Sequence, residues 1–296
     1  MITSNKIGKN IIDVRMLTKG NSDKFQFLLI SDVHFDHPKC KRDVLKKHLD
    51  EAVKRGAKIM VNGDTFCIMQ GVNDKRHTKS DVRPEHMGIN YFDLVIDEAV
   101  EWWSPYAEHI IFFAYGNHET SVIKKNEFDI LQRFVQLLNF KNNTSIHVGG
   151  YSGWVKFSAF RGGKCCNGLM KYHHGYGGGG PVTRGTIQHY RMANSVMNAD
   201  VIWMGHVHEL YHITSIKEYV KTNKRTEVCF KHVHEVRTAT YKEEFNDGSF
   251  GWHVERGAPP KPLGGYWMDV SMVRRYQAGE DILSMEYNFT PAIGYQ

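Results

Sequence analysis

The chain has 296 residues, of which 41% are hydrophobic, 24% charged and 12% aromatic. This is an ordinary globular composition, which excludes a disordered or fibrous chain. No stretch approaches the roughly 18 uninterrupted apolar residues of a membrane-spanning helix, and the N-terminus lacks the apolar centre of a signal peptide. We therefore expect a soluble, cytoplasmic protein that does not interact with membranes.

The net charge of +6 is unevenly distributed along the chain. Residues 1–80 contain 16 Lys and Arg against 9 Asp and Glu, a surplus of 7, whereas residues 81–296 contain 22 against 23. The excess lies in runs such as Lys39–Arg42 and Lys75–His77. A basic patch of this kind attracts polyanions, nucleic acid among them. A solvated helix face is the alternative explanation.

The five cysteines show no C-x-x-C spacing. Neither a zinc knuckle nor a disulfide framework fits them, and reduced thiols agree with a cytosolic protein. The adjacent Cys165 and Cys166 are interpreted as two buried small residues of one strand rather than as a redox pair.

The predicted elements alternate between strands and helices. In chain order we expect a strand at 25–30, a helix at 41–55, a strand at 57–61, a helix at 92–103, a strand at 110–114, a helix at 127–138, strands at 151–160 and 169–174, a helix at 186–197 and a strand at 201–204. This alternation predicts an α/β fold with sheet and helices in layers. In such folds ligands bind at the carboxyl ends of the strands.

Two segments depart from the alternation. Thr65–Asn90 is long for a connection within a compact domain, which predicts either a functional loop insertion or a further element that the pattern does not reveal. The part from Ile213 to the C-terminus is strand-rich, with hairpin signals at Asn223-Lys224 and Asn246–Gly248, and we expect it to complete a second sheet. No linker or repeat divides the sequence, so residues 1–296 are expected to form a single domain.

Polar clusters follow several predicted strands. Asp32-Val-His34 places a carboxylate and an imidazole two residues apart, so that both can point to one face and bind the same cation. His206-Val-His208 repeats this arrangement on another strand. His232-Val-His234 has the same spacing without an adjacent glycine turn, and is interpreted as one face of an ordinary strand.

Five clusters occur in a characteristic order: Asp32-x-His34, Gly63-Asp64, Gly116-Asn117-His118-Glu119, His173-His174-Gly175 and Gly205-His206-x-His208. This order resembles the calcineurin-like metallophosphoesterases, whose pattern is D-x-H, G-D, G-N-H-[D/E], H and G-H-x-H. The motifs span residues 32 to 208. The resemblance implies a layered β-sandwich flanked by helices, and an enzyme that hydrolyses phosphate esters.

The resemblance also implies a site for two divalent metal ions with seven ligands: Asp32, His34 and His208 for one ion, Asn117, His174 and His206 for the other, and Asp64 as the bridge. Ligands of these types suit Mn²⁺, with Fe and Zn²⁺ as alternatives. Two such ions share and activate a hydroxide, which attacks phosphorus. His118 is implied to be the general acid that protonates the leaving oxygen.

Two positions depart from the family pattern or leave it ambiguous. The residue three after the bridging aspartate is acidic in many members and is Cys67 here, which brings the tuning of the metals into question. Neighbouring strand residues point to opposite faces, so we expect only one of His173 and His174 to be a ligand. The glycine that follows favours His174.

Substrate contacts are expected on both sides of the motifs. Gly175–Pro181 is either a backbone cradle for a bulky phosphate ester or a flexible connector, and Arg184 beyond it is a candidate phosphate contact. Lys75 and Arg76 lie in the loop after the bridging aspartate. The basic first quarter favours a phosphodiesterase acting on nucleic acid or nucleotides. A phosphomonoesterase is the alternative, and a metal-free scaffold is disfavoured because every expected ligand and His118 are present.

Overall fold

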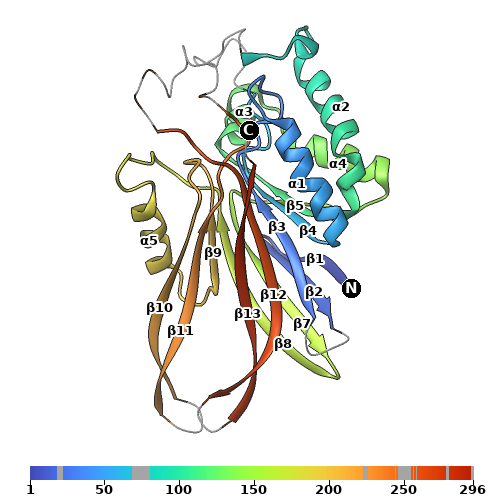
Figure 1. Ribbon diagram of the computed structural model, residues 1–296. Helices are drawn as coiled ribbons and strands as arrows, with labels where there is room; N and C mark the ends of the chain where they lie inside the picture. The colour runs from blue at the N-terminus through green and yellow to red at the C-terminus, as the bar shows by residue number, and fades with distance from the viewer. Residues whose placement is uncertain are drawn as a thin grey trace.

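A computed structural model describes residues 1–18, 23–68, 81–222, 226–243, 245, 255, 257, 259–277 and 280–294. Two β-sheets face each other, and helices cover their outer sides (Figure 1). The strands are β1 (Ile2–Gly8), β2 (Ile11–Leu17), β3 (Lys24–Ile30), β4 (Lys58–Asn62), β5 (Ile110–Ala114), β6 (His147–Gly149), β7 (Ser152–Arg161), β8 (Lys164–His173), β9 (Val201–Met204), β10 (Tyr211–Lys221), β11 (Glu227–Arg237), β12 (Leu263–Gln277) and β13 (Glu280–Gly294). The α-helices are α1 (Arg42–Arg55), α2 (Tyr91–Trp103), α3 (Asn117–Asn126), α4 (Ile130–Asn142) and α5 (Thr186–Ser195), and two 3₁₀ turns are η2 (Pro84–His86) and η3 (Ser104–His109).

Both sheets mix parallel and antiparallel pairs. The order in one is β1-β2-β7-β8-β9-β11-β10, and in the other β13-β12-β3-β4-β5-β6. Strands β3, β4, β5 and β6 run parallel, and β12 joins β3 antiparallel. In the facing sheet β8 and β9 are parallel. The parallel strands therefore bring several carboxyl ends to one edge of the sandwich.

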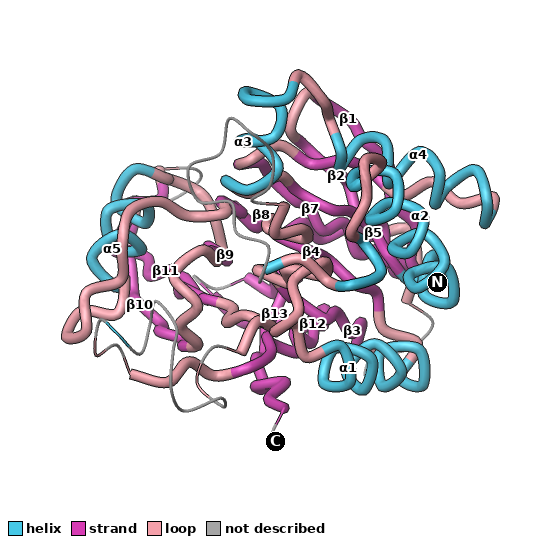
Figure 2. Tube along the Cα trace, turned by 90° about the horizontal axis from the view of Figure 1, so that it is seen from above, coloured by secondary structure: helices cyan, strands magenta, loops and turns pink. Residues whose placement is uncertain are grey.

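Apolar side chains fill the space between the layers. Between the sheets, Phe27 meets Phe157 at a ring-centroid distance of 5.3 Å. Outside the six-stranded sheet, Trp103 of α2 packs on Phe113 of β5 at 5.2 Å. Every residue of β5 is buried, as a central strand covered on both faces requires. Helix α5 lies on the other sheet (Figures 1 and 2).

One side chain joins the two sheets at the edge where the motif loops gather. The Asn62 amide, at the end of β4, donates to the carbonyl oxygens of His173 at 3.2 Å and Trp203 at 3.4 Å. These carbonyls belong to β8 and β9 of the facing sheet. The loops that follow the strands of both sheets are thereby held opposite one another.

The predicted α/β fold, with a layered β-sandwich flanked by helices, is confirmed. The strands at 110–114 and 201–204 have the predicted bounds. The helix predicted at 127–138 is present as α4, but it begins three residues later and ends at Asn142. The preceding helix, α3, was not predicted. Glu127 adopts a left-handed φ of 53° that ends α3, and the Asp129 carboxylate accepts the Gln132 N–H at 3.0 Å at the start of α4. The antiparallel pair β1–β2 was not predicted.

The C-terminal part is strand-rich as predicted, but it contributes to both sheets instead of completing one, since β10 and β11 lie in the seven-stranded sheet and β12 and β13 in the six-stranded sheet. β10 and β11 pair on either side of the Asn223-Lys224 signal, and β12 pairs with β13. The second hairpin signal, 246–248, lies outside the described residues. Residues 69–80 of the expected insertion also lie outside them, and η2 is found in its described part.

Cys166 is buried in β8 as expected, but Cys165 is exposed, because alternate strand residues face opposite sides. The strand at His232–His234 is confirmed as part of β11. Among the described residues, no helix is long and apolar enough to cross a bilayer.

Candidate metal centre

Side chains from five strand ends converge at the joined edge. Asp32 and His34 follow β3, Asp64 follows β4, Asn117 begins α3 after β5, His174 follows β8, and His206 and His208 follow β9. Their potential ligand atoms form two groups in which all members lie within 4.8 Å of one another: Asp32 with His34 and His208, and Asp64 with His174 and His206. The structure thus brings together every residue that the sequence motifs indicated as a metal ligand.

The backbone of this centre is strained. Five of the seven candidate ligands have a left-handed φ: Asp32 at 52°, His34 at 50°, Asp64 at 49°, His206 at 74° and His208 at 58°. This region costs a residue with a Cβ about 1–2 kcal/mol. Such conformations persist where the surrounding structure enforces them, and they concentrate at functional sites. The strained turns therefore indicate a functional site, in which the direction of the side chains matters more than the stability of the turns.

The first group surrounds Asp32. Its Oδ1 lies 3.4 Å from the Nε2 of His208, and that Nε2 lies 3.4 Å from the Nε2 of His34. The backbone N–H of His206 donates to both carboxylate oxygens at 2.9 and 3.1 Å, and the Ser31 hydroxyl donates to Oδ2. These donors fix the carboxylate while leaving two imidazole nitrogens directed at the same space.

The second group surrounds Asp64. The Nε2 of His174 lies 3.2 Å from the Asp64 Oδ2 and 3.2 Å from the Asn117 Oδ1. The opposite nitrogen, Nδ1, donates to the carbonyl of Asn62 at 2.8 Å, which orients the ring. The same Nε2 is 3.9 Å from the Asp32 Oδ1. The two groups are therefore contiguous, with Asp64 and His174 at their junction.

Two motif glycines allow this close approach. A Cβ on Gly116 would lie 2.1 Å from the Asp64 Oδ1, and a Cβ on Gly63 would lie 2.4 Å from the His174 Nδ1. Neither contact is sterically possible for a residue with a side chain. The glycines in the G-D and G-N-H motifs are thus explained by the space that the neighbouring ligands occupy.

Burial and charge act against each other in this centre. Burial raises the pKa of Asp64, but the nearby His174 and His118 outweigh it and hold that pKa well below its usual value. Burial lowers the pKa of His174, but Asp64 and Asp32 reverse this and raise it to about 10. Burial, reinforced by the charge of His118, holds the pKa of His34 well below its usual value. In the metal-free protein, His174 is therefore the cation that compensates the two carboxylates.

The donor set fits two divalent ions. Carboxylate oxygens, imidazole nitrogens and an amide oxygen are ligands typical of Mn²⁺, Fe and Zn²⁺. The Nδ1 of His34 is buried without a hydrogen-bond partner among the described residues, while its Nε2 faces the group. Asp32, His34 and His208 would hold one ion, Asn117, His174 and His206 the other, and Asp64 lies where it can serve both.

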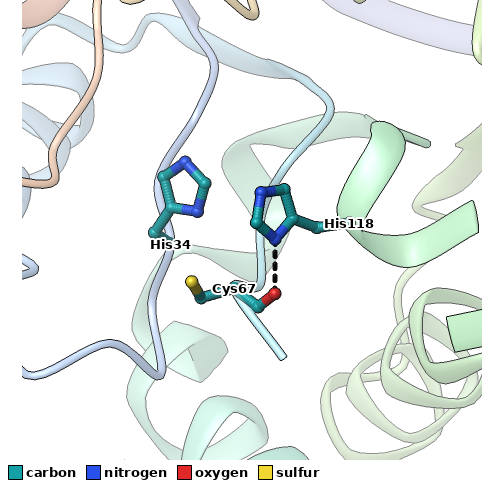
Figure 3. Close-up of side chains that lie close together, drawn as sticks. All are labelled: His34, Cys67 and His118. Carbon is teal, nitrogen blue, oxygen red and sulfur yellow. Dashed lines mark hydrogen bonds between the residues drawn. The ribbon is translucent and has the colours of Figure 1, made fainter. Parts of the chain in front are cut away.

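His118 lies beside the ligands without belonging to either group. Its Nδ1 donates to the carbonyl of Cys67 at 2.5 Å, and its Nε2 lies 3.8 Å from the Asp64 Oδ2 (Figure 3). The Cys67 Sγ and one ring nitrogen each of His34 and His118 lie within 4.8 Å of one another. Burial raises the pKa of Cys67 well above its usual value, so the side chain at this position is a neutral thiol where an acidic residue was expected.

The two adjacent histidines are separated as the strand pattern predicted. His174 is fully buried among the ligands, whereas the Nδ1 of His173 accepts the backbone N–H of Gly175 at 2.9 Å. The His173 ring contacts Tyr151 and Tyr176 instead of the carboxylates. The geometry therefore supports His174 as the candidate ligand.

Sequence analysis placed Glu119 in the third motif but assigned no role to this buried side chain, which supports the centre. Glu119 accepts the backbone N–H groups of Asp64 at 3.1 Å, Gly116 at 2.8 Å and Phe66 at 3.0 Å. Burial and the charge of Asp64 raise its pKa to about 8. Its position three residues into α3, where an acidic side chain can turn back on the helix start, was the available signal.

The structure describes only some of the predicted substrate contacts. Arg184 is exposed in the turn before α5, with a left-handed φ of 47°. That turn packs on Val207, between two candidate ligands. Lys75 and Arg76 lie outside the described residues. The run 39–42 is partly used internally, because Arg42 donates to both oxygens of Glu98 and to the Phe35 carbonyl.

Comparison with known proteins adds a structural similarity. A solved structure titled "GAP50 the anchor in the inner membrane complex of Plasmodium" aligns with 92% of this chain and 90% of its own, at a TM-score of 0.40 and 10% identity. A scan against protein-family models and a search of curated proteins each found no match. The interpretation of the site therefore rests on its own residues and their geometry.

The adjacent histidines allow a direct test of the ligand set. His174→Ala removes an imidazole between Asp64 and Asn117, and we expect it to lower the bound Mn²⁺ by about one ion per chain. His173→Ala removes a ring that points away, and serves as the matched control with unchanged metal content. Elemental analysis after dialysis measures both, and the opposite result would move the ligand to His173.

Metal binding should release protons. Because the pKa of His174 is raised to about 10 in the metal-free protein, its ring is cationic at pH 7.5 and must lose a proton to coordinate. Affinity for Mn²⁺ should therefore rise as pH rises toward 10. Calorimetric titrations at pH 7.5 in buffers of different ionisation enthalpy count the protons released. A binding enthalpy that is independent of the buffer would contradict this charge state.

Proposed function

We propose that this chain is a calcineurin-like, metal-dependent phosphoesterase that holds two divalent ions, Mn²⁺ foremost. The observation that carries the proposal is the convergence of seven carboxylate, imidazole and amide side chains from five strand ends into two contiguous groups. The His118 ring lies beside them, with its Nδ1 hydrogen-bonded to a backbone carbonyl. When bound, two such ions lower the pKa of a shared water and neutralise charge on a phosphate ester.

The protein residues around this centre have separable tasks. Asp64, whose Oδ1 accepts the N–H of His118 at 3.0 Å, ties the start of α3 to the end of β4. Glu119 holds the same turn through three backbone amides. These contacts keep the distance between His118 and the ligand groups fixed, which favours a reaction that depends on orientation.

His118 is proposed as the general acid. With Nδ1–H donated to the Cys67 carbonyl, the other ring nitrogen, Nε2, faces the centre. A protonated Nε2 can give its hydrogen to the oxygen that leaves phosphorus, so that an alcohol departs rather than an alkoxide. Because a carbonyl oxygen only accepts hydrogen bonds, Nδ1 must keep its hydrogen, and Nε2 is the nitrogen that donates the proton to the leaving oxygen.

We further propose that the substrate is a phosphodiester in nucleic acid or a nucleotide. The surplus of basic residues in positions 1–80 supports this class, because a polyanion gains affinity from each neutralised phosphate. Arg42 is engaged with Glu98, so the support comes chiefly from Lys75, Arg76 and Lys79 after the bridging aspartate, and from the exposed Arg184.

Replacement of the general acid should separate chemistry from metal binding. We expect His118→Asn to retain its metal and to lose roughly 10²–10⁴-fold in turnover of an alkyl phosphodiester. The loss should be smaller for bis-p-nitrophenyl phosphate, because nitrophenolate needs little protonation. His173→Asn, in a ring turned away from the centre, is the matched control. Equal losses on the alkyl and nitrophenyl esters would contradict the general-acid role.

Polyanion binding should depend steeply on salt. If the loop after Asp64 contacts the substrate, the association constant for a single-stranded oligonucleotide should fall with salt, with a logarithmic slope of about 0.7 per phosphate contacted. Reversing the charge of Lys75, Arg76 and Lys79 together should flatten this slope. Fluorescence anisotropy of a labelled oligonucleotide at several salt concentrations measures it.

The matched control reverses three cations at the other end of the sandwich. Arg161, Lys164 and Lys221 lie at strand ends about 30 Å from the centre, since β8 runs ten residues from Lys164 to His173. The same change in net charge there should leave the salt slope close to that of the native protein. An unchanged slope in the loop variant would contradict nucleic acid as the substrate.

A further inference from the structure

A second concave site lies near the metal centre. A cavity of about 710 Å³ opens between η2, the start of α2 and the residues that follow α3. Its size is in the range of small-molecule pockets, about 300–1,000 Å³. The wall contains three aromatic side chains, Tyr91, Phe92 and Phe128, with Met87 and Ile89 beside them.

The aromatic wall offers flat ring surface. Phe92 and Phe128 are half-buried and stacked, with centroids 5.5 Å apart and an interplanar angle of 23°. Tyr91 adjoins Phe92 at 5.6 Å. Ile89 is fully exposed and Met87 is 58% exposed, so apolar surface here remains in contact with water. This surface is available to a planar ligand at little cost in rearrangement.

Polar groups complete the wall. The amide side chains of Asn90 and Asn126 and the carboxylate of Asp93 line the same cavity. His86 lies buried in the wall, with its Nε2 bonded to Glu98 at 2.7 Å and its Nδ1 without a partner among the described residues. Apolar rings combined with a few amide, carboxylate and imidazole groups suit a heteroaromatic ring that carries its own donors and acceptors better than a plain hydrocarbon.

Hydrogen bonds connect this cavity to the general acid. The Tyr91 hydroxyl and the Cys67 backbone N–H donate to the two oxygens of Asp36, at 2.9 and 2.5 Å. The Cys67 carbonyl in turn accepts the Nδ1–H of His118. Helix α3 also spans the two places, since His118 is its second residue and its last residue, Asn126, lines the cavity.

Three hydrogen bonds therefore join the cavity wall to His118, through Asp36 and Cys67. A general acid protonates the oxygen that leaves, so the group behind that oxygen departs on the side of the acid. We propose that the cavity binds the heteroaromatic base of the leaving nucleoside, stacked on Phe92 and Phe128. This inference rests on the proposed phosphodiesterase function and specifies which part of the substrate the protein recognises.

A nucleoside without phosphate tests the pocket independently of the metals. The fluorescence of 2-aminopurine deoxyriboside is quenched when its base stacks, and titration with metal-free protein should quench it with a dissociation constant of about 1 mM or lower. Phe92→Leu and Phe128→Leu should each weaken binding at least about tenfold. Phe140→Leu, at an 88% exposed aromatic on α4, is the matched control and should bind like the native protein.

Hydrolysis of dinucleotides tests the link to the reaction. With Mn²⁺, a dinucleotide whose leaving nucleoside lacks its base should react roughly ten- to a hundredfold more slowly in kcat/KM than the complete one. Phe92→Leu should abolish that ratio, and Phe140→Leu should keep it. Circular dichroism shows whether each variant is folded.

The outcomes are distinguishable. If the native protein does not quench the nucleoside, or if both pocket variants quench it like the native protein, the base pocket is overturned. If the nucleoside binds and no diester is hydrolysed, the pocket stands and the proposed phosphodiesterase function fails. If diesters are cleaved but the missing base changes nothing, the cavity does not serve the leaving group.

Discussion

The structure depends on two carboxylates held away from water beside imidazoles. Asp32 and Asp64 are nearly fully buried, and an isolated buried carboxylate is too costly to remain ionised. The charge of His174, together with His208 beside Asp32 and His118 beside Asp64, holds the pKa values of both carboxylates below the usual range. Removing one partner would leave an uncompensated charge, so this edge tolerates little change. Bound cations would perform the same compensation more strongly.

Much of the surrounding structure serves to hold these groups at short distance. The strands supply a rigid frame, and the turns after them adopt left-handed conformations that aim the side chains inward. Glu119 ties the turns after β4 and β5 through three amides, and the Asn62 amide fastens the two sheets together. The hydrogen bonds of Glu119 and Asn62, which are not candidate metal ligands, thus offset the strain in the turns. Pre-organisation of this kind is what electrostatic catalysis requires.

The same hydrogen-bonded frame extends from the ligands to the aromatic cavity. Cys67 lies at the middle of it, with its N–H donated to Asp36 and its carbonyl accepting from His118. Cys67 replaces the acidic residue expected at this position, but its backbone N–H and carbonyl still connect Asp36 with His118. Tyr91 brings the cavity wall to the opposite oxygen of Asp36. A single buried carboxylate, Asp36, therefore connects His118 with the wall of the cavity.

The sequence by itself determined the layered α/β fold, because apolar strands and amphipathic helices are local features. The order of its Asp, His and Gly motifs, through their resemblance to a known family, supplied the set of candidate ligands. Strand alternation allowed only one of His173 and His174 to be a ligand, and the glycine that follows favoured His174. Only the tertiary structure decided the boundary between α3 and α4, the pairing of β1 with β2, the role of Glu119 and the cavity behind His118. The last three depend on contacts between separate segments of the chain, and the helix boundary depends on the left-handed turn at Glu127. Local pattern carries no information about those contacts.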